Sequence, residues 1–265
     1  LSRCYNEFEN LKKTMNIKSD QPIITFCNRD EAYKQYQMPN IDSSYHNYRN
    51  FSVQDFELAI RNMIKKKYFV IRMGNITKNK IEMNDKNFFD YSKSDYISPL
   101  MDVYLIHKSK FFINPETGLI AVAMFMHKPI VYVNSLHLML HRTYIRNSLF
   151  IPKKLFNLET NKYLTFSQML NPNFKKNKRD GKPAGLYLRS DDYRDANIKV
   201  INNTKEEINN VVEEMHLYLN RKLELNYEDL KLQKEFWSKY GNEFPSSDKH
   251  MISPSFLKAN SYLLE

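Results

Sequence analysis

Short runs of apolar residues alternate along this chain with segments in which apolar side chains recur every three or four positions. Residues 23–27 and 68–74 are nearly continuous apolar runs, which is typical of strands buried on both faces. The segment between them has helical spacing and follows Ser52, a suitable N-cap; its apolar positions are Phe56, Ala59, Ile60, Met63 and Ile64. The pattern predicts a strand, a helix and a strand, which is the size of a β-α-β unit.

A second unit of the same kind is clearer. Residues 111–114 predict a strand, and residues 115–118 predict a turn. Residues 119–127 predict a largely apolar helix, which Pro129 stops before a further strand at 130–133. Strands that alternate with short helices build a parallel sheet with helices on both faces. The predicted fold class is therefore α/β, with a Rossmann-like parallel sheet.

The last third of the chain is predicted to be helical. Thr204 and Glu207 form a capping-box pattern ahead of apolar residues at helical spacing. We expect three parts along the chain. An N-terminal helix or leader covers residues 1–21, a Rossmann-like domain covers 22–200, and C-terminal helices over 201–265 pack on that domain.

Composition narrows the class of protein. Glycine is scarce, with 5 residues in a chain of 265, and neither a Walker loop nor a G-x-G-x-x-G fingerprint is present. The longest uncharged apolar run, residues 119–126, is much shorter than the roughly 20 residues that span a bilayer. The two cysteines, Cys4 and Cys27, are far apart in the sequence, which favours a reduced compartment. We therefore expect a soluble, cytoplasmic protein.

The charge balance favours an anionic partner. The chain carries 40 Lys and Arg against 30 Asp and Glu, a formal net charge of +10. Nucleic acid, an acidic membrane surface or a phosphorylated small molecule would each suit that charge, and AT-rich coding sequence would also produce the Lys excess. A basic tract at residues 174–179 fits a nucleic-acid-binding module, but no RNA- or DNA-binding motif accompanies it. We interpret it as a solvated loop or a patch for anionic lipids and expect no nucleic-acid partner.

Polar residues follow three of the predicted strands, at 28–30, 72–74 and 115–118. The ligand of an open parallel sheet binds outside the carboxyl ends of the strands, so these residues are expected to share one crevice. Arg29 and Arg72 lie at neighbouring strand ends, and guanidinium groups bind phosphate bidentately. The pattern favours a ligand that carries a diphosphate.

Single glycines also fall at these strand ends. Thr117 and Gly118 precede the predicted apolar helix, where free N–H groups, the helix dipole and a hydroxyl would bind phosphate. Gly74 and Gly118 would let a diphosphate approach the backbone closely. The alternative at Thr117 and Gly118 is an ordinary N-cap turn.

Four further residues are candidates for a role in the crevice. Asp30 is a candidate general base, because a carboxylate beside an arginine at a strand end is held in position; a structural pairing with Arg29 is equally consistent. His46 and Arg49 occupy a loop long enough to fold over the crevice, although a loop histidine often has no chemical role. Asp102 would accept hydrogen bonds from a ribose or a base, or serve only as a carboxylate at a helix start.

The sequence offers little for a metal ion or a bound cofactor. His137 and His141 are four positions apart, but the H-E-x-x-H pattern and a third ligand are missing. No two aspartates are separated by one residue, so the Asp-x-Asp pair of many metal-dependent sugar transferases is absent. We expect no metal and no cofactor.

Several of these stretches together resemble a family of bacterial glycosyltransferases from surface-polysaccharide gene clusters. The matching stretches are residues 28–33, 48–50, 70–74, 101–105, 116–119, 149–153 and 253–257. Residues 102–118 are also similar in layout to the donor-binding half of GDP-fucose transferases and heptosyltransferases of the GT-B type. In those relatives an arginine and a Ser or Thr contact the diphosphate, which corresponds here to Arg29 and Thr117.

The resemblance implies transfer of a sugar from a nucleotide-sugar to a saccharide or lipid-linked acceptor, without a metal, at the cytoplasmic side or peripherally at the inner membrane. Asp30 or His46 would take the acceptor proton. The implied donor-binding residues are Arg29, Arg49, Arg72, Gly74, Asp102, Glu116, Thr117 and Gly118, with Glu116 facing a sugar hydroxyl. A non-catalytic nucleotide- or sugar-binding domain and a basic nucleic-acid-binding module remain as alternatives.

The acceptor-binding half of a GT-B enzyme normally precedes its donor domain. The sequence begins at Leu1 and leaves no room for that half before Pro22. Either it lies upstream of Leu1, or residues 30–50 and 135–182 form the acceptor side.

Overall fold

The computed structural model describes residues 2–138, 146–170, 189–239 and 250–265. Its centre is a sheet of seven strands in the order β10-β6-β5-β4-β1-β2-β3, and every neighbouring pair in it is parallel. The strands are β1 (Ile23–Phe26), β2 (Phe69–Arg72), β3 (Phe88–Asp90), β4 (Phe112–Asn114), β5 (Ile130–Ser135), β6 (Ser148–Pro152) and β10 (His250–Ile252).

The order of the strands reverses between β1 and β4. From β1 the chain adds β2 and β3 on one side, and then returns to place β4, β5 and β6 on the other side. This is the strand order of a Rossmann fold, in which a crevice opens where the order reverses. The α/β class and the parallel sheet predicted from the sequence are confirmed.

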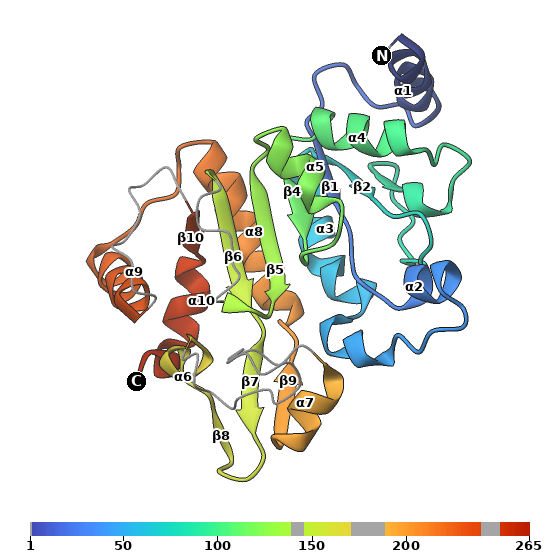
Figure 1. Cartoon of the computed structure of the whole chain (residues 1–265). Helices are drawn as coiled ribbons and strands as arrows, with labels where there is room; N and C mark the ends of the chain where they lie inside the picture. Colours follow the sequence, from blue (N-terminus) through green and yellow to red (C-terminus); the bar gives the residue numbers. More distant parts are fainter. Residues whose placement is uncertain (1, 139–145, 171–188, 240–249) are drawn as a thin grey trace.

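Helices cover both faces of the sheet (Figure 1). α3 and α8 pack on each other and against β2, β5 and β6, while α1, α4 and α5 form a second packed group. The helical segments are α1 (Ser2–Thr14), α2 (Ala32–Gln37), α3 (Glu57–Lys65), α4 (Pro99–Lys108), α5 (Ile120–Phe125), α6 (Phe166–Leu170), α7 (Ser190–Asp195), α8 (Lys205–Leu219), α9 (Tyr227–Lys239) and α10 (Pro254–Ala259), with 3₁₀ turns η1 (Ser44–Arg49), η2 (Val53–Phe56), η3 (Tyr91–Lys93) and η5 (Ser261–Leu264).

Local sequence explains where several helices begin. Thr204 and Glu207 form the capping box of α8, with the Thr204 hydroxyl accepting from the Glu207 N–H and the Glu207 carboxylate accepting from the Thr204 N–H. Ser52 caps η2 by accepting from the N–H of Gln54, and α3 follows directly. Both helix starts agree with the sequence prediction. α5 is shorter than the predicted helix at 119–127, because the chain leaves helical geometry at His127, where φ is +52°.

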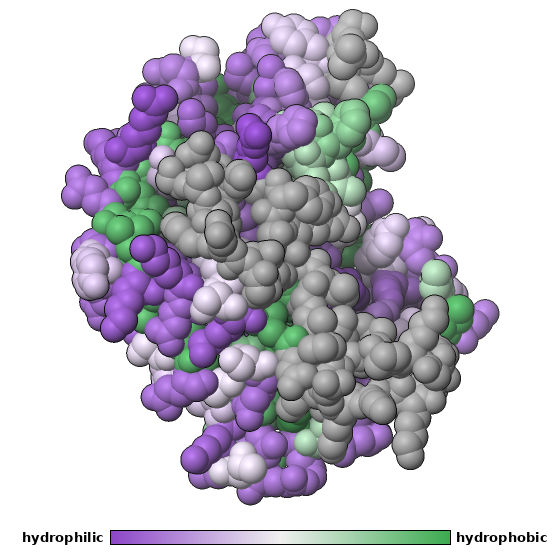
Figure 2. All heavy atoms as spheres, turned by 60° about the vertical axis from the view of Figure 1, so that its left-hand side comes forward, coloured by the Kyte–Doolittle hydropathy of each residue, from purple (hydrophilic) through white to green (hydrophobic). Residues whose placement is uncertain are grey.

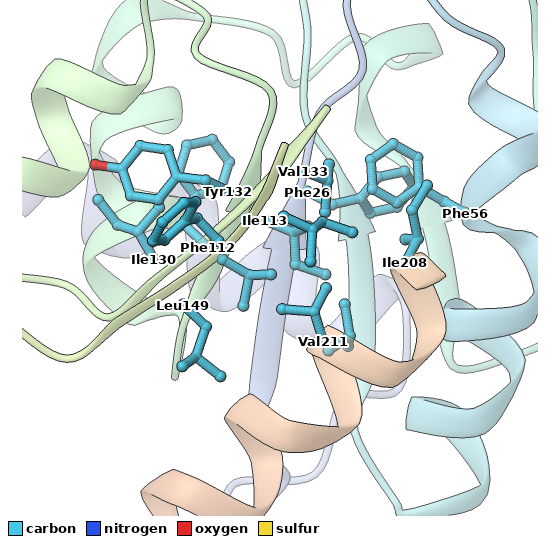
Figure 3. Close-up of a cluster of buried hydrophobic side chains, with 14 of the residues drawn as sticks. Phe26, Phe56, Phe112, Ile113, Ile130, Tyr132, Val133, Leu149, Ile208 and Val211 are labelled. Carbon is cyan, nitrogen blue, oxygen red and sulfur yellow. The ribbon is translucent and has the colours of Figure 1, made fainter. Parts of the chain in front are cut away.

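The core lies between the sheet and its covering helices (Figure 3). Ile208 and Val211 of α8 face the sheet on the side to which Ile113 points, whereas Phe112 and Tyr132 lie on the opposite side of the strands. This alternation is the two-residue period of a strand. Because both faces of the sheet are buried here, the sequences of β1, β2 and β4 are nearly continuous apolar runs.

A small antiparallel sheet, β8-β7-β9, extends from the end of the main sheet. Its strands are β7 (Lys154–Asn157), β8 (Lys162–Tyr163) and β9 (Ile198–Ile201). β7 begins two residues after β6 ends, so this sheet lies at the carboxyl side of the main strands, together with α7 (Figure 1). The sequence pattern does not predict it.

The C-terminal region contains a strand as well as helices. Residues 201–265 supply α8, α9 and α10, as expected, and also β10, which pairs with β6 at the edge of the main sheet. No helix in the described segments is long and apolar enough to cross a membrane. Hydrophilic residues dominate the described part of the face shown in Figure 2, with smaller hydrophobic areas between them.

A buried ion pair joins β2 to its edge strand β3. Arg72 is 0 % exposed, and its Nη1 donates to Asp90 Oδ2 at 2.9 Å and to the Asn79 carbonyl at 2.7 Å. The second nitrogen, Nη2, donates to Asn28 Oδ1 at 3.1 Å. Arg72 and Asp90 are also register partners in the parallel ladder. The guanidinium therefore ties the ends of β1, β2 and β3 together.

Removal of the Asp90 carboxylate should destabilise the fold strongly. In Asp90→Ala the Arg72 charge stays buried without its counter-ion, which costs about 3–5 kcal/mol of unfolding free energy. Urea denaturation followed by circular dichroism measures this change. Arg61→Ala is the control, because Arg61 and Glu57 form an exposed pair, and its loss should cost less than about 1 kcal/mol. Equal costs in the two variants would contradict a structural role for the buried pair.

Candidate functional site

The strand ends at the carboxyl edge of the sheet carry the candidate site. The arrowheads of β4 and β5 point toward the end of the molecule where α2 and α7 lie (Figure 1). The chain leaves β1 into residues 28–50, which include α2 and η1, and leaves β4 into the turn at 115–118. Lys153 directly follows β6. These segments come from different parts of the chain and meet beside the point where the strand order reverses.

Lys153 fixes the loop of η1 to the end of β6. It is 1 % exposed, and its Nζ donates to the backbone carbonyls of Tyr48 at 2.9 Å and Asn50 at 3.3 Å. Burial, with the nearby charges of Arg49 and Arg29, lowers the pKa of Lys153 to about 7. The ammonium is thus held in an unfavourable, positively charged environment by two carbonyl oxygens.

Sequence reasoning assigns no role to Lys153, although residues 149–153 are among the stretches that carry the resemblance and Lys153 stands directly after a parallel strand, where ligand-binding residues gather. The sequence pattern does not predict β6, so the position of Lys153 at a strand end cannot be recognised from it. Ser148 is a polar residue at the start of this buried strand, and Pro152 ends it, so the run lacks the uniform apolar character of β1 or β2.

Arg29 lies beside Lys153 at the end of β1. Burial and the charge of Arg49 lower the pKa of Arg29 to about 10. Its Nε is buried and has no hydrogen-bond partner among the described residues. Its backbone carbonyl accepts from the N–H of Phe51 at 3.3 Å, which closes the loop of residues 30–50 back onto the strand end. This buried donor is unsatisfied, which is unusual for a guanidinium nitrogen and is a reason to inspect the site for a ligand.

Arg49 joins this loop to the turn after β4. Its Nη2 donates to the carbonyl of Glu116 at 3.0 Å. Glu116 has a φ of +62°, a left-handed conformation that is costly for a residue with a side chain. Glu116 therefore positions Arg49 through its backbone carbonyl, which is a role that the sequence did not predict for it.

His46 lies in η1 among several positive charges. Burial, with the charges of Lys34, Arg29, Arg49 and Arg189, lowers the pKa of His46 to about 4, so the imidazole is neutral at neutral pH. Its Nδ1 is buried and lacks a hydrogen-bond partner in the described part of the chain. A neutral histidine with a vacant ring nitrogen has the chemistry of a proton acceptor.

An aromatic residue holds the outer cations in place. The Tyr45 ring lies under Lys34, whose Nζ is 5.2 Å from the ring centroid, and under Arg189, whose Cζ is 4.6 Å from it. Tyr45 also contacts the His46 ring, with the centroids 4.1 Å apart. No local sequence pattern predicts this arrangement, because Arg189 is far from Tyr45 along the chain.

Five cations surround His46 and the end of β6, and we refer to them as the cationic cluster: Arg29, Lys34, Arg49, Lys153 and Arg189. Within the described segments, no ion pair joins any of them to a carboxylate. Asp30 and Asp55 act electrostatically on Arg29 and Lys153 but form no ion pair with them. Like charges that gather with so little compensation in a partly buried site are unfavourable unless an anion binds there. The arrangement is suited to bind a multivalent anion.

Asp30 stands next to Arg29 but is engaged elsewhere. Its Oδ1 accepts from the N–H of Ala32 at 3.0 Å, and its Oδ2 accepts from the N–H of Lys78 at 3.0 Å. Both oxygens thus hold the loop after β1 against the loop after β2. These contacts give Asp30 a structural role and leave His46 as the stronger candidate for proton transfer.

Arg72 and Gly74 also have structural explanations. The Arg72 guanidinium nitrogens Nη1 and Nη2 donate to Asp90, Asn79 and Asn28 as described above, while its Nε is buried without a partner among the described residues. Gly74 has a φ of +140°, and a Cβ there would lie 2.9 Å from Thr77 Cγ2. The backbone itself therefore requires glycine at this position. We leave both residues out of the proposed ligand-binding set.

The turn after β4 is built around a buried amide. Asn114 Nδ2 donates to Thr117 Oγ1 at 2.9 Å and to Cys27 Sγ at 3.1 Å, while its Oδ1 accepts from the Thr117 N–H at 2.7 Å. The thiol of Cys27 is buried, which raises its pKa to about 12, and it lies 3.3 Å from the Thr117 hydroxyl. The hydroxyl thus contributes to the link between β1 and β4. A Cβ on Gly118 would meet no atom within 4 Å, so this side of the turn is open.

Asp102 lies in the first turn of α4, after the N-cap Ser98. Burial raises the pKa of the Asp102 carboxyl, and the nearby Tyr91 hydroxyl opposes that rise. Its Oδ1 is buried and has no partner among the described residues. The charge of Asp102 also acts on Cys27, which directly follows β1. A role in contacting a ribose or a base stays a prediction.

Metal and nucleic-acid sites gain no support from the described residues. No group of three or more His, Cys, Asp or Glu side chains in those segments could hold a metal ion. His137 is described, whereas His141 lies outside the described residues, as does the basic tract at 174–179.

The depressed pKa of Lys153 predicts a dependence of stability on pH. Below about pH 7 the lysine is protonated in both the folded and the unfolded chain. Between about pH 7 and its ordinary pKa of 10.5 the unfolded chain binds the additional proton, so the unfolding free energy should rise with pH. In Lys153→Met this part of the rise should be lost, and urea denaturation at a series of pH values measures it.

The control for this experiment is Lys65→Met, at an exposed position on α3, which should keep the pH dependence of the unmodified chain. If Lys153→Met showed the same rise as the unmodified chain, the buried ammonium would not be the titrating group.

No protein-family model and no curated protein matches the chain. A solved structure, that of the ADP-heptose LPS heptosyltransferase II of E. coli, is similar over 48 % of this chain, with 19 % identity and a TM-score of 0.29. The match covers 37 % of that enzyme, so this chain spans well under two thirds of its length. A likeness at this level assigns neither fold nor function. The fold class rests on the strand order of the sheet described above.

Proposed function

We propose that the cationic cluster binds the diphosphate of a nucleotide-sugar and that the chain transfers the sugar to a saccharide or lipid-linked acceptor without a metal. The observation that carries this proposal is the convergence of five cations, none of which forms an ion pair with a carboxylate in the described segments. They stand beside the reversal of strand order, which is where ligands bind in open parallel sheets.

Arg29 and Arg49 would bind the two phosphates of the donor. Guanidinium groups donate in a planar fork that matches phosphate oxygens, and Arg29 Nε is buried without a partner among the described residues. As the bond to the sugar breaks, negative charge builds up on the leaving diphosphate. Cations that are already fixed in place stabilise that charge without further rearrangement. Lys153 holds the loop of η1 and adds its own charge to the site.

His46 would accept the proton of the acceptor hydroxyl. In the absence of a ligand, the surrounding cations keep its pKa near 4, which makes it a weak base. A bound diphosphate would neutralise those cations and raise the pKa of His46 toward its ordinary range. Proton transfer would then be coupled to occupation of the donor site.

The loop that carries α2 supports a lipid-linked acceptor and peripheral contact with a membrane. Four large hydrophobic side chains are exposed there within nine residues: Tyr33 at 51 %, Tyr36 at 68 %, Met38 at 53 % and Ile41 at 56 %. They precede η1 and its His46 along the same loop. Exposed apolar side chains next to a basic site suit an amphiphilic, anionic partner.

A second candidate is a non-catalytic domain that binds a nucleotide or a sugar. The engagement of Asp30 with two backbone N–H groups favours it, because this removes one of the two predicted proton acceptors. The two functions differ in turnover. A binding domain would retain nucleotide-sugar without releasing nucleoside diphosphate, across a panel of saccharide and lipid-linked acceptors.

Arg29→Ala and Arg49→Ala should each weaken nucleoside-diphosphate binding at least tenfold, since each removes a charge-assisted contact worth about 1.5–3 kcal/mol. Isothermal titration calorimetry with UDP, GDP and ADP measures the affinity. His46→Gln should leave the affinity for nucleoside diphosphate nearly unchanged and remove sugar transfer, measured as release of nucleoside diphosphate from the matching nucleotide-sugar.

Arg61→Ala is the matched control, because it removes an exposed arginine on α3 that is paired with Glu57. It should bind as the unmodified chain does. Unchanged affinity in both Arg29→Ala and Arg49→Ala, in variants that still fold, would exclude the cationic cluster as the donor site. Unchanged turnover in His46→Gln would exclude only its catalytic role.

A further inference from the structure

A second cationic site lies at the opposite edge of the sheet. A cavity of about 390 Å³ opens between α1, the segment at residues 17–23, and the residues that lead into β4 and β5. Because Pro22, Lys110 and Lys128 all precede strands, the cavity faces the amino ends of the parallel strands. Its volume is within the range of pockets that bind small organic ligands.

Lysine dominates the lining of this cavity, which we name the amino-edge pocket. Its lysines are Lys12, Lys18, Lys108, Lys110 and Lys128. Among the described lining residues Glu9 is the one carboxylate, and it already pairs with Lys12 at 3.3 Å. The remaining four ammonium groups have no carboxylate beside them in the lining. The pocket therefore carries a local excess of positive charge.

One of these lysines is held in the wall of the pocket. The Nζ of Lys128 donates to the backbone carbonyl of Ser109 at 2.9 Å. Burial and the charges of Lys108 and Lys110 lower the pKa of Lys128. The backbone of Lys110 is itself fixed, because its N–H donates to the carbonyl of Ile23 at 2.7 Å. The fold thus holds the ammonium group of Lys128 at the pocket and fixes the backbone that carries Lys110.

The floor of the pocket is apolar. Phe8, Ile17 and Ile23 line it and are each buried, at 3 %, 7 % and 7 % exposure. An apolar wall lowers the local dielectric response and strengthens the attraction between the ammonium groups and an anion. Lysine ammonium groups bind phosphate as point charges, and several of them around one cavity suit a ligand with more than one negative charge.

We propose that the amino-edge pocket binds a phosphate monoester or diphosphate group at a site distinct from the cationic cluster. The group belongs either to a soluble phosphorylated compound or to the headgroup of an anionic lipid, since both present the same chemistry to the lysines. This site does not depend on the proposed sugar transfer, because its residues lie at the other edge of the sheet.

The test compares two double variants with the same loss of charge. Lys110→Gln with Lys128→Gln removes two lysines of the amino-edge pocket. Lys231→Gln with Lys234→Gln removes two exposed lysines of α9 and serves as the control. Calorimetry with pyrophosphate is performed on the full chain and on both variants, and flotation with phosphatidylcholine vesicles with and without phosphatidylglycerol forms a second arm. Circular dichroism establishes that each variant is folded.

Pyrophosphate should bind the unmodified chain and the α9 control equally, and the pocket variant should lose one binding site or bind at least tenfold more weakly. Loss of vesicle binding in the pocket variant alone would identify a lipid headgroup as the source of the phosphate. If both variants bind pyrophosphate and vesicles alike, or if the unmodified chain binds neither, the proposal is overturned. Arg29→Ala distinguishes the two sites. This variant should still bind pyrophosphate at the amino-edge pocket even if it no longer binds nucleoside diphosphate at the cationic cluster.

Discussion

The reversal of strand order between β1 and β4 is the constraint on which the rest of the structure depends. The chain leaves these two strands in different directions, so no direct connection between them covers their carboxyl ends. The loops around the two strand ends therefore determine which side chains line this edge of the sheet. The turn after β4 is tied back to β1 through Asn114, Cys27 and Thr117. The long loop after β1 returns over the same edge, where Lys153 binds two of its carbonyl oxygens. Chain topology and one buried ammonium together bring distant residues into a single site.

The same arrangement has an electrostatic cost. The pKa values of Lys153, Arg29 and His46 are all lowered by burial and by neighbouring cations, which means that the folded chain holds positive charge where it is unfavourable. Structural ion pairs elsewhere in the protein do not share this property, since Arg72 has Asp90 and Lys154 has Glu207. Departures from local electrostatic balance occur in proteins mainly where a ligand supplies the missing charge. The cationic cluster and the lysines of the amino-edge pocket both show it for positive charge.

The sequence predicts the strands that are buried on both faces. It does not predict elements and contacts that depend on residues far apart along the chain. β1, β2, β4 and β5 are apolar runs, and the capping box of α8 is local, so each can be recognised from a few residues. β3, β6 and β10 are short or begin with polar residues. They can be recognised only from their backbone pairing with neighbouring strands in the structure. In the site, Arg29, Arg49 and His46 were found from their place after a strand or in its loop. The contacts that commit Asp30 to the loop after β2, and Arg72 to β3, join residues 18 to 48 positions apart, so no local pattern could have indicated them.

Hydrogen–deuterium exchange with and without a saturating nucleoside diphosphate tests the central claim most directly, because it reports where an anion binds without any substitution. Binding at the cationic cluster should slow exchange in the backbone of residues 28–32 and 44–51 and leave the residues of α9 unchanged. Nucleoside-diphosphate binding that slowed exchange only away from the carboxyl edge of the sheet, or no binding at any concentration tested, would contradict the account.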